Sequence, residues 1–408
     1  MNTHKRRLAI AGVISLSLLA AACGSDDDEA TTTTALAATT AAPDTTAAGG
    51  ATTEPAGDTT EPAEETTAPA ETTAPADTAG ETTEPSADLE AELNASGATF
   101  PQTFYEEAIA GFTEANSGVT INYAGGGSGK GRQDLADQIV DWAGTDGTIK
   151  DEDLASYKGG DVLYFPTVVA PITVSYNLDV EGIMLSPTTI AKIFQLEITN
   201  WNDPAIAAEN PDAELPDQAI TVVHRSDSSG TTGNFTKFLE KSVGADAGGI
   251  WKLGTDSTVE WDANTQAGEG NSGVAQIITS TPGAIGYVDL SDAIDAGLTF
   301  ATVQNKAGKW IEPTLDGASA AAAGAEVADN LTYSAIWADG DDAYPITAQT
   351  WIIAYKTQTD EAKADALKAF LTYVLTDGQE LAPEVNYAPL PEELAAKALA
   401  QVDQLTVG

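Results

Sequence analysis

The sequence has few of the side chains on which most catalytic and metal sites depend. Its 408 residues include one cysteine, Cys23, and two histidines, His4 and His224. A single cysteine excludes an intrachain disulfide and any cysteine-based structural zinc site. Two histidines leave little material for a histidine-based metal centre or a catalytic triad. We therefore expect neither a metal nor a cofactor.

Basic residues are also scarce. The chain has 18 Lys and Arg against 62 Asp and Glu, a formal net charge of −44. Nucleic acids are bound by clustered basic side chains, so this balance argues against a nucleic-acid partner and against a basic membrane-binding patch. Residues 91–408 carry 46 of the acids and 15 of the bases. This excess is typical of a surface adapted to salt, and a lineage bias in composition would explain it equally well.

The first residues predict an export signal. Three basic residues at 5–7 precede an apolar stretch, 8–19, that is shorter than the about 20 residues of a membrane-spanning helix. Small residues then lead to Cys23. The arrangement resembles a bacterial lipoprotein signal, which implies cleavage after residues 1–22 and a lipid on Cys23. Ala20 stands where such signals usually have leucine, so a plain secretory signal is the alternative.

Residues 23–90 predict a disordered tether. The segment consists mainly of Ala, Thr, Pro, Glu and Gly, with no aromatic residue and no Lys or Arg. Such a composition buries too little apolar surface to offset the entropy lost on ordering. A flexible chain of this length reaches about 40–50 Å, which suits a spacer between a membrane and a folded domain.

The rest of the chain alternates between strand-like and helix-like patterns. Leu135, Ile139 and Trp142 have helical spacing, as do Phe235, Phe238 and Leu239. Alternating strands and helices favour an α/β fold with largely parallel sheets, and the length favours two lobes. The predicted strands are Val119–Tyr123, Thr167–Ala170, Ile172–Tyr176, Ala219–Val223 and Thr350–Tyr355.

Two segments between a predicted strand and a predicted helix are candidates for a ligand site. Residues 122–131 are rich in glycine, so their backbone can approach a ligand while the helix start offers free N–H groups. The P-loop spacing is absent, and a turn that serves only packing is the alternative. Residues 222–233 place Arg225 among hydroxyls and glycines, with Asp227 spaced to hold its guanidinium. Here the alternative is a helix cap with a surface arginine.

Several motifs give the chain a family resemblance. Segments 97–101, 127–128, 144–146 and 225–231 occur in the order seen in the phosphate-binding proteins of phosphate ABC transporters. The resemblance covers about residues 95–395. It implies a type II periplasmic-binding-protein fold, with two α/β lobes, a ligand cleft and crossover hinge strands. The implied lobes are 91–170 with 287–408, and 171–286. Further matching segments are Phe165–Thr167, Trp201–Ile206, Pro282–Tyr287 and Tyr344–Thr347.

The resemblance also implies a set of phosphate ligands. Asp146 is the one acceptor, which takes a hydrogen bond from a protonated phosphate, and Asp227 steadies Arg225 from behind. Lys130, which departs from the family pattern, is expected to point to solvent. The implied donors to phosphate are Thr99, Phe100, Ser128, Arg225, Ser229, Gly230 and Thr231.

The resemblance implies a lipid-anchored monomer that captures inorganic phosphate and delivers it to a membrane permease. It implies no enzymatic activity. The sequence leaves open a receptor for another oxyanion, such as phosphite, arsenate or a phosphate ester. An unrelated alternative is a phosphatase that uses Ser228 or Ser229 as nucleophile beside His224, although no second base accompanies that histidine.

Overall fold

A computed structural model describes residues 89–408. The predicted signal peptide 1–22, the lipidation site Cys23 and nearly all of the tether 23–90 lie outside the described residues. The strands are β1 Ala91–Gly97, β2 Val119–Ala124, β3 Trp142–Thr145, β4 Val162–Tyr176, β5 Met184–Leu185, β6 Thr221–Arg225, β7 Gln266–Gly268, β8 Ala284–Asp289, β9 Thr299–Phe300, β10 Thr302–Gln304, β11 Trp310–Ile311, β12 Thr347–Tyr355, β13 Thr357–Gln358, β14 Ala388–Pro389 and β15 Thr406–Val407. The α-helices are α1 Gln102–Ala115, α2 Ser128–Ala136, α3 Pro187–Phe194, α4 Pro204–Glu209, α5 Gly230–Val243, α6 Gly270–Ser280, α7 Leu290–Asp295, α8 Leu315–Ala323, α9 Glu361–Leu375, α10 Gly378–Leu381 and α11 Glu392–Val402.

The main sheet runs in the order β2-β1-β3-β12-β4-β8-β6-β7. Its two ends are parallel, because β1 pairs in parallel with β2 and β3, and β6 with β7 and β8. Its centre is antiparallel, because β12 runs against β3 and β4, and β4 runs against β8. The α/β fold predicted from the sequence is confirmed, with parallel pairing confined to the two ends.

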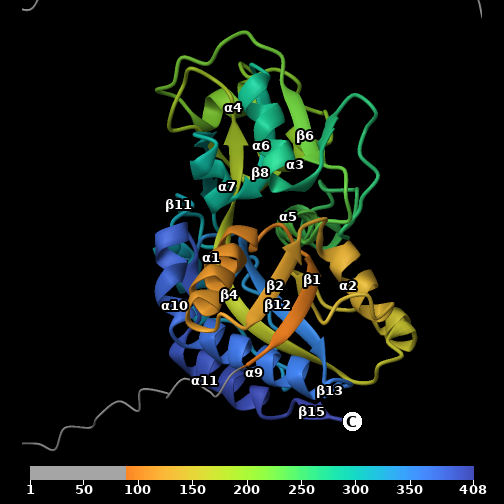
Figure 1. Ribbon diagram of the computed structural model, residues 1–408. Helices are drawn as coiled ribbons and strands as arrows, with labels where there is room; N and C mark the ends of the chain where they lie inside the picture. The colour runs from red at the N-terminus through yellow and green to blue at the C-terminus, as the bar shows by residue number, and fades with distance from the viewer. Residues whose placement is uncertain (1–88) are drawn as a thin grey trace, which may run out of the picture. The chain divides into compact units, whose positions relative to one another are not determined.

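Strand β4 joins two lobes. Its first part, Val162–Pro171, pairs with β12, and its second part, Ile172–Tyr176, pairs with β8. We call the part built on β1, β2, β3 and β12 the first lobe and the part built on β6, β7 and β8 the second lobe. Figure 1 shows β4 running from the first lobe, which contains α2 and α9, into the second, which contains α3 and α6. The residue boundaries proposed for the lobes stay a prediction.

Two of the predicted strands form one strand. Thr167–Ala170 and Ile172–Tyr176 are both parts of β4, and Pro171 between them lies where β4 changes partner from β12 to β8. A proline donates no backbone hydrogen bond, so a position where the partner changes accommodates it at little cost.

One of the predicted helices is too long. Helix α2 ends at Ala136, Gln138 has a φ of 58°, and Ile139 is 66% exposed. Trp142, which we predicted on the same helical face, is instead the buried first residue of β3. The helical spacing of Leu135, Ile139 and Trp142 was a coincidence, because Trp142 is buried as part of the sheet and not on the face of a helix. The helix predicted around Phe235, Phe238 and Leu239 is confirmed as α5.

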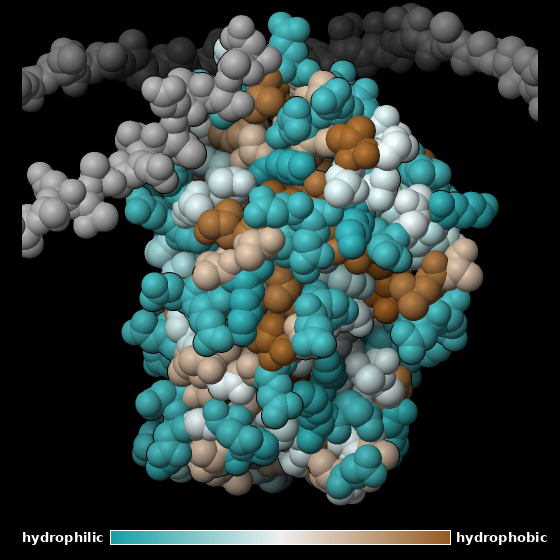
Figure 2. All heavy atoms as spheres, turned by 90° about the horizontal axis from the view of Figure 1, so that it is seen from below, coloured by the Kyte–Doolittle hydropathy of each residue, from teal (hydrophilic) through white to brown (hydrophobic). Residues whose placement is uncertain are grey.

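The core of the first lobe contains a group of packed aromatic side chains. Trp142 stacks on Tyr123 with ring centroids 5.2 Å apart, and Tyr105 meets Trp142 edge-on at 5.6 Å. These rings fix β2, β3 and α1 beside the turns described below. The face seen in Figure 2 is largely hydrophilic, with scattered apolar residues. Within residues 89–408, no helix has the length and hydropathy needed to cross a membrane.

Candidate ligand-binding site

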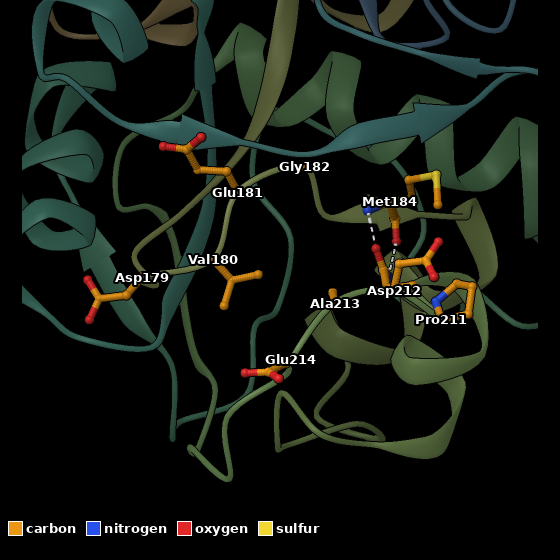
Figure 3. Close-up of a pocket in the computed structure, with 10 residues that line it drawn as sticks. Asp179, Val180, Glu181, Gly182, Met184, Pro211, Asp212, Ala213 and Glu214 are labelled. Carbon is orange, nitrogen blue, oxygen red and sulfur yellow. Dashed lines mark hydrogen bonds between the residues drawn. The ribbon is translucent and has the colours of Figure 1, made fainter.

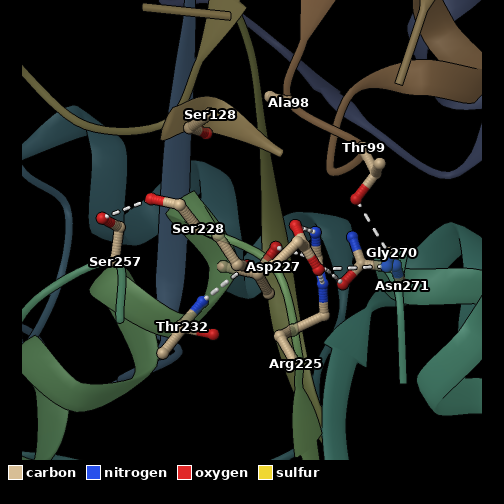
Figure 4. Close-up of polar contacts among 12 residues, drawn as sticks. Ala98, Thr99, Ser128, Arg225, Asp227, Ser228, Thr232, Ser257, Gly270 and Asn271 are labelled. Atoms are coloured by element: carbon tan, nitrogen blue, oxygen red, sulfur yellow. Dashed lines mark hydrogen bonds and ion pairs between the residues drawn. The ribbon is translucent and has the colours of Figure 1, made fainter. Parts of the chain in front are cut away.

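Three turns, each leading from a strand into a helix, meet at one point (Figure 4). They connect β1 to α1, β2 to α2, and β6 to α5. The amide of Gly127 donates to the carbonyl of Gly97 at 2.9 Å, and the amide of Gly129 donates to that of Ser228 at 2.9 Å. Gly127 has a φ of 90°, and a Cβ on it would lie 2.3 Å from Oδ2 of Asp227. A glycine is therefore needed where the first lobe touches the second.

Asp146 follows β3 and is 2% exposed. Its Oδ2 accepts from the Ser128 hydroxyl at 3.0 Å, and its Oδ1 accepts from the Thr350 hydroxyl at 2.7 Å. Burial raises the pKa of Asp146 to about 6, although these two hydrogen bonds and the charge of Arg225 act in the opposite direction. Asp146 is therefore a buried carboxylate whose two oxygens are already oriented by hydroxyl donors.

Arg225 is the last residue of β6, and its side chain is buried. Nε donates to Oδ1 of Asp227 at 2.7 Å, and Nη2 donates to Oδ2 at 2.5 Å. Nη1 contacts the Thr231 hydroxyl at 3.3 Å and Oδ1 of Asn271 at 3.0 Å. Burial raises the pKa of Asp227, but the hydrogen bonds and charge of Arg225 outweigh this and lower it overall. The predicted pairing of Arg225 with Asp227 is present, and it holds the guanidinium in one orientation.

The start of α5 supplies backbone donors. Ser229 is the N-cap, and its hydroxyl accepts from the amide of Thr232 at 3.1 Å. The amides of the first two helical residues stay free, and the positive end of the helix dipole lies beside them. Within residues 89–408, the N–H groups of Phe100, Ser128, Gly230 and Thr231 at the junction donate to no protein acceptor. All four residues are among the donors that the resemblance implied, whereas the amide of Ser229, another of them, donates to the carbonyl of Ser257 at 2.9 Å.

Gly230 brings α5 against the first lobe. A Cβ on it would lie 2.3 Å from the Ser128 hydroxyl and 2.4 Å from Oδ2 of Asp146. The helix start, the serine and the carboxylate are therefore in close contact across the two lobes.

The first turn contributes Thr99 and Phe100. The Thr99 hydroxyl accepts from the amide of Asn271 at 3.4 Å, across the lobes (Figure 4). The Phe100 ring is buried and meets Tyr387 edge-on at 6.1 Å, and the Tyr387 hydroxyl donates to the Phe100 carbonyl at 2.6 Å. The side chain and carbonyl of Phe100 thus fix the turn, which leaves its amide free.

The structure brings every predicted ligand residue to this junction. Their role in binding phosphate stays a prediction. The residues are Thr99, Phe100, Ser128 and Asp146 from the first lobe, and Arg225, Ser229, Gly230 and Thr231 from the second.

Two residues at the junction were missed by the sequence analysis. Asn271 is the second residue of α6, directly after the glycine-bearing turn from β7, and its Oδ1 accepts from Nη1 of Arg225 while its fully buried Nδ2 has no partner within the described residues. The strand, glycine and helix pattern of residues 266–271 was a signal that could have found it. Thr350 has no such signal, because only the sheet order brings it to Asp146.

Lys130 and His224 have roles other than those considered from the sequence. Lys130 is half exposed and forms an ion pair with Asp134 one helical turn away. His224 has Nδ1 2.9 Å from the carbonyl of Arg225 and Nε2 3.0 Å from the Thr265 hydroxyl. Both nitrogens thus have partners other than Ser228 and Ser229, the two nucleophiles of the phosphatase alternative.

A cavity of about 470 Å³ in the second lobe has a different chemistry (Figure 3). Four of its lining residues are acidic, Asp179, Glu181, Asp212 and Glu214. The concentration of carboxylates disfavours an anion there. Among residues 89–408, no group of three or more His, Cys, Asp or Glu side chains is arranged to hold a metal ion.

The fold and the junction define a two-lobed solute-binding protein. The PBP superfamily domain matches residues 67–378 of the chain. The chain is 35% identical over 316 residues to the phosphate-binding protein PstS of Pasteurella multocida, which covers 76% of this chain and 89% of that protein. It is also 35% identical over 339 residues to PstS of Methanocaldococcus jannaschii, and this alignment covers 77% of this chain and 86% of that protein. The chain therefore belongs to the PstS family of phosphate-binding proteins, within the PBP superfamily.

A solved structure supports the same fold. The periplasmic phosphate-binding protein PfluDING, bound with phosphate, aligns with a TM-score of 0.64 at 22% identity. The alignment covers 76% of this chain and 94% of that one.

Proposed function

We propose that this chain captures inorganic phosphate and delivers it to the permease of a phosphate ABC transporter. One observation carries the proposal: a buried carboxylate, Asp146, faces a buried guanidinium, Arg225, at a junction otherwise lined by hydroxyls and free amides. The relatives named above bear the name phosphate-binding protein, which agrees with this chemistry.

The donors suit a dehydrated tetrahedral anion. Burying an ion is costly unless nearly every lone pair is matched, and hydroxyls and amides provide such matching without excess charge. Arg225 supplies the formal positive charge. Two of its five N–H groups donate to Asp227. The two on Nη1 contact Thr231 and Asn271, which leaves one N–H on Nη2. A bound phosphate takes the remaining Nη2 bond and displaces the longer contact to the Thr231 hydroxyl, which then donates to the anion as well.

Asp146 provides selectivity in this proposal. Phosphate near neutral pH keeps at least one proton and donates it to the carboxylate, whereas fully deprotonated sulfate meets lone-pair repulsion. A site built to accept a polar hydrogen rejects an analogue that lacks it by about 10⁴–10⁵-fold. The negative charge of the whole body does not oppose binding, because short-range donors dominate inside a closed junction.

The proposed ligands come from two lobes, 91–170 with 287–408 and 171–286. Strand β4 passes between them. We propose that phosphate closes the lobes by a hinge motion about such crossover strands, because neither lobe alone presents both Asp146 and Arg225. The proposed permease then recognises the closed form.

The attachment to a membrane rests on the N-terminal sequence. We propose that Cys23 carries a lipid, that the protein acts outside the cytoplasm as a monomer, and that it has no enzymatic activity. Metabolic labelling with a fatty acid tests the anchor: label should enter the wild-type chain and be absent from Cys23→Ser. Equal labelling of both chains contradicts it.

Calorimetry with phosphate and sulfate tests the binding proposal. We expect one tight phosphate per chain and no comparable sulfate binding. Asp146→Asn should reduce the difference between the affinities for phosphate and sulfate. Arg225→Ala should weaken phosphate binding by several kcal/mol, as expected when a buried charged donor is lost. Equal affinity for both anions in the wild type, or none for phosphate, overturns the proposal.

A further inference from the structure

A second cavity, of about 230 Å³, lies directly beside the junction. Asp146 and Gly230 line it, and so do residues farther along the same elements, such as Thr148 after β3 and Lys237 on α5. Tyr333 and Trp351 form part of its apolar wall. The cavity therefore draws on both lobes, and it shares Asp146 and Gly230 with the phosphate ligand set proposed above, whereas its basic residues lie outside that set.

The cavity collects positive charge in a strongly acidic protein. Arg132, Lys150 and Lys237 line it, although residues 91–408 hold only 15 basic residues against 46 acids. Lys150 pairs with Asp256 at 2.7 Å, and both side chains are substantially exposed at the rim. Within residues 89–408, neither Arg132 nor Lys237 has a carboxylate partner within 4.0 Å.

The unpaired cations are partly removed from water. The Arg132 guanidinium contacts only the Thr145 hydroxyl, at 2.9 Å from Nη1. Burial, followed by the nearby charge of Lys241, lowers the pKa of Lys237. A half-buried ammonium without a counter-ion is unfavourable by itself, and an anion in the cavity relieves that cost.

Tyr333 also lines this cavity, and its buried hydroxyl is a neutral donor. It is 8% exposed, and its hydroxyl is buried without a partner within the described residues. The ring is fixed edge-on against Trp351 at 5.7 Å. Burial raises the pKa of Tyr333, so the hydroxyl keeps its proton at neutral pH. A buried hydroxyl without a partner costs free energy that a bound acceptor recovers.

We propose that this cavity is a second anion site, which takes a small inorganic oxyanion through Arg132, Lys237 and Tyr333. Its donors are cations and a hydroxyl, and the carboxylates that line it already have partners: Asp256 has Lys150, and Asp146 has Ser128 and Thr350. None of the three proposed ligands, Arg132, Lys237 and Tyr333, requires a proton on the anion, in contrast to Asp146 in the phosphate site. The second site therefore accepts sulfate, which the proposed phosphate site rejects.

Sulfate is the probe that separates the two sites. Protein loaded with one phosphate per chain and freed of excess phosphate is titrated with sulfate at constant ionic strength, with chloride as the balancing anion, and bound radiolabelled sulfate is measured by equilibrium dialysis. We expect saturable binding of one sulfate per chain. Lys237→Gln should weaken it at least about tenfold, as for loss of a charged hydrogen-bond donor, and Tyr333→Phe should weaken it less.

Lys241→Gln is the matched control, because Lys241 lies one turn farther along α5 and its Nζ contacts the carbonyl of Ile336. It should weaken sulfate binding much less than Lys237→Gln does, because Lys241 acts on the cavity only through its charge. No saturable sulfate binding in the wild type, or equal binding by the Lys237 and Lys241 variants, overturns the second site. If the protein does not bind phosphate, only the proposed function is overturned. The second anion site is then tested by the same sulfate titration carried out without phosphate.

Discussion

The hydroxyl of Thr350 donates to Oδ1 of Asp146 at 2.7 Å, from the neighbouring strand β12 to the end of β3. The pairing of β12 with β4 shifts register between Gln349 and Trp351, so Thr350 lies in an irregularity of the strand. Such irregularities redirect a side chain. The shift therefore explains how a central strand, otherwise fully buried, supplies a polar partner to the junction.

The raised pKa of Asp146 predicts a pH-dependent stability. With a folded-state pKa of about 6 against 3.8 for the free group, the folded protein binds a proton more tightly than the unfolded chain. The free energy of unfolding of phosphate-free protein should therefore decrease as pH rises through about 4 to 6, by about 3 kcal/mol for this group. Urea unfolding across this range measures it. Asp146→Asn should lack this part of the slope, and parallel profiles for the two proteins contradict the assignment.

Removal of the Thr350 hydroxyl should alter anion selectivity. The hydrogen bond from Thr350 lowers the pKa of Asp146, so Thr350→Val raises it further and leaves more of the carboxyl protonated at neutral pH. A protonated carboxyl is a donor and tolerates sulfate. We expect the phosphate-to-sulfate affinity ratio to fall about tenfold at pH 7 and to recover as pH rises.

Calorimetry at several pH values tests this. Thr347→Val is the control, because Thr347 is also buried in β12 but its hydroxyl donates to the carbonyl of Tyr344. If both valine variants keep the wild-type ratio at every pH, Thr350 has no part in selectivity.

Much of the junction could be predicted because its parts are local in sequence. Arg225 and Asp227 are two residues apart, and the strand, the glycines and the hydroxyls around them occupy one short segment. The same holds for the turn before Ser128. Thr350 is different, because it lies 204 residues from Asp146 and meets it only through the order of strands and a register shift. No local pattern encodes such a contact.

The helix predicted through Trp142 failed for a related reason. An apolar residue at helical spacing can belong to the helix or to the next strand, and it is buried in both cases. The sequence pattern does not distinguish these two placements. Trp142 packs from β3 against Tyr123 on β2. The largely parallel sheets that we expected are parallel only at the two ends of the main sheet, because β4 and β12 run antiparallel in its centre.

Asn271 should matter for phosphate binding although the resemblance did not imply it. Its Oδ1 contacts Nη1 of Arg225 at 3.0 Å, and its Nδ2 is buried without a partner within residues 89–408. Asn271→Ala frees the guanidinium and removes a donor, so we expect phosphate affinity to fall about tenfold. Asn202→Ala, at an exposed position, should leave affinity unchanged. Equal calorimetric affinities for these two variants contradict a positioning role.

The acidic surface predicts a salt-dependent stability. Residues 91–408 hold 46 acids and 15 bases, so self-repulsion is large and counter-ions screen it. The thermal unfolding midpoint should rise appreciably from low to molar sodium chloride, and potassium chloride should act in the same way. A flat response in both salts leaves lineage bias as the explanation of the composition.

Gly230→Ala should oppose closure of the lobes. Its Cβ would lie 2.3 Å from the Ser128 hydroxyl and 2.4 Å from Oδ2 of Asp146, whereas a Cβ on Gly233 would meet its nearest atom at 3.6 Å. Overpacking typically costs about 1–3 kcal/mol, so phosphate affinity should fall about tenfold to a hundredfold in Gly230→Ala and change little in Gly233→Ala.

Calorimetry gives the affinities, and small-angle scattering with saturating phosphate shows whether the lobes close. The radius of gyration of the Gly230 variant should stay above that of the wild type, and the Gly233 variant should match the wild type. Equal affinities and equal radii for both alanine variants would show that phosphate is bound without this contact, so that the two lobes need not approach as closely as they do here.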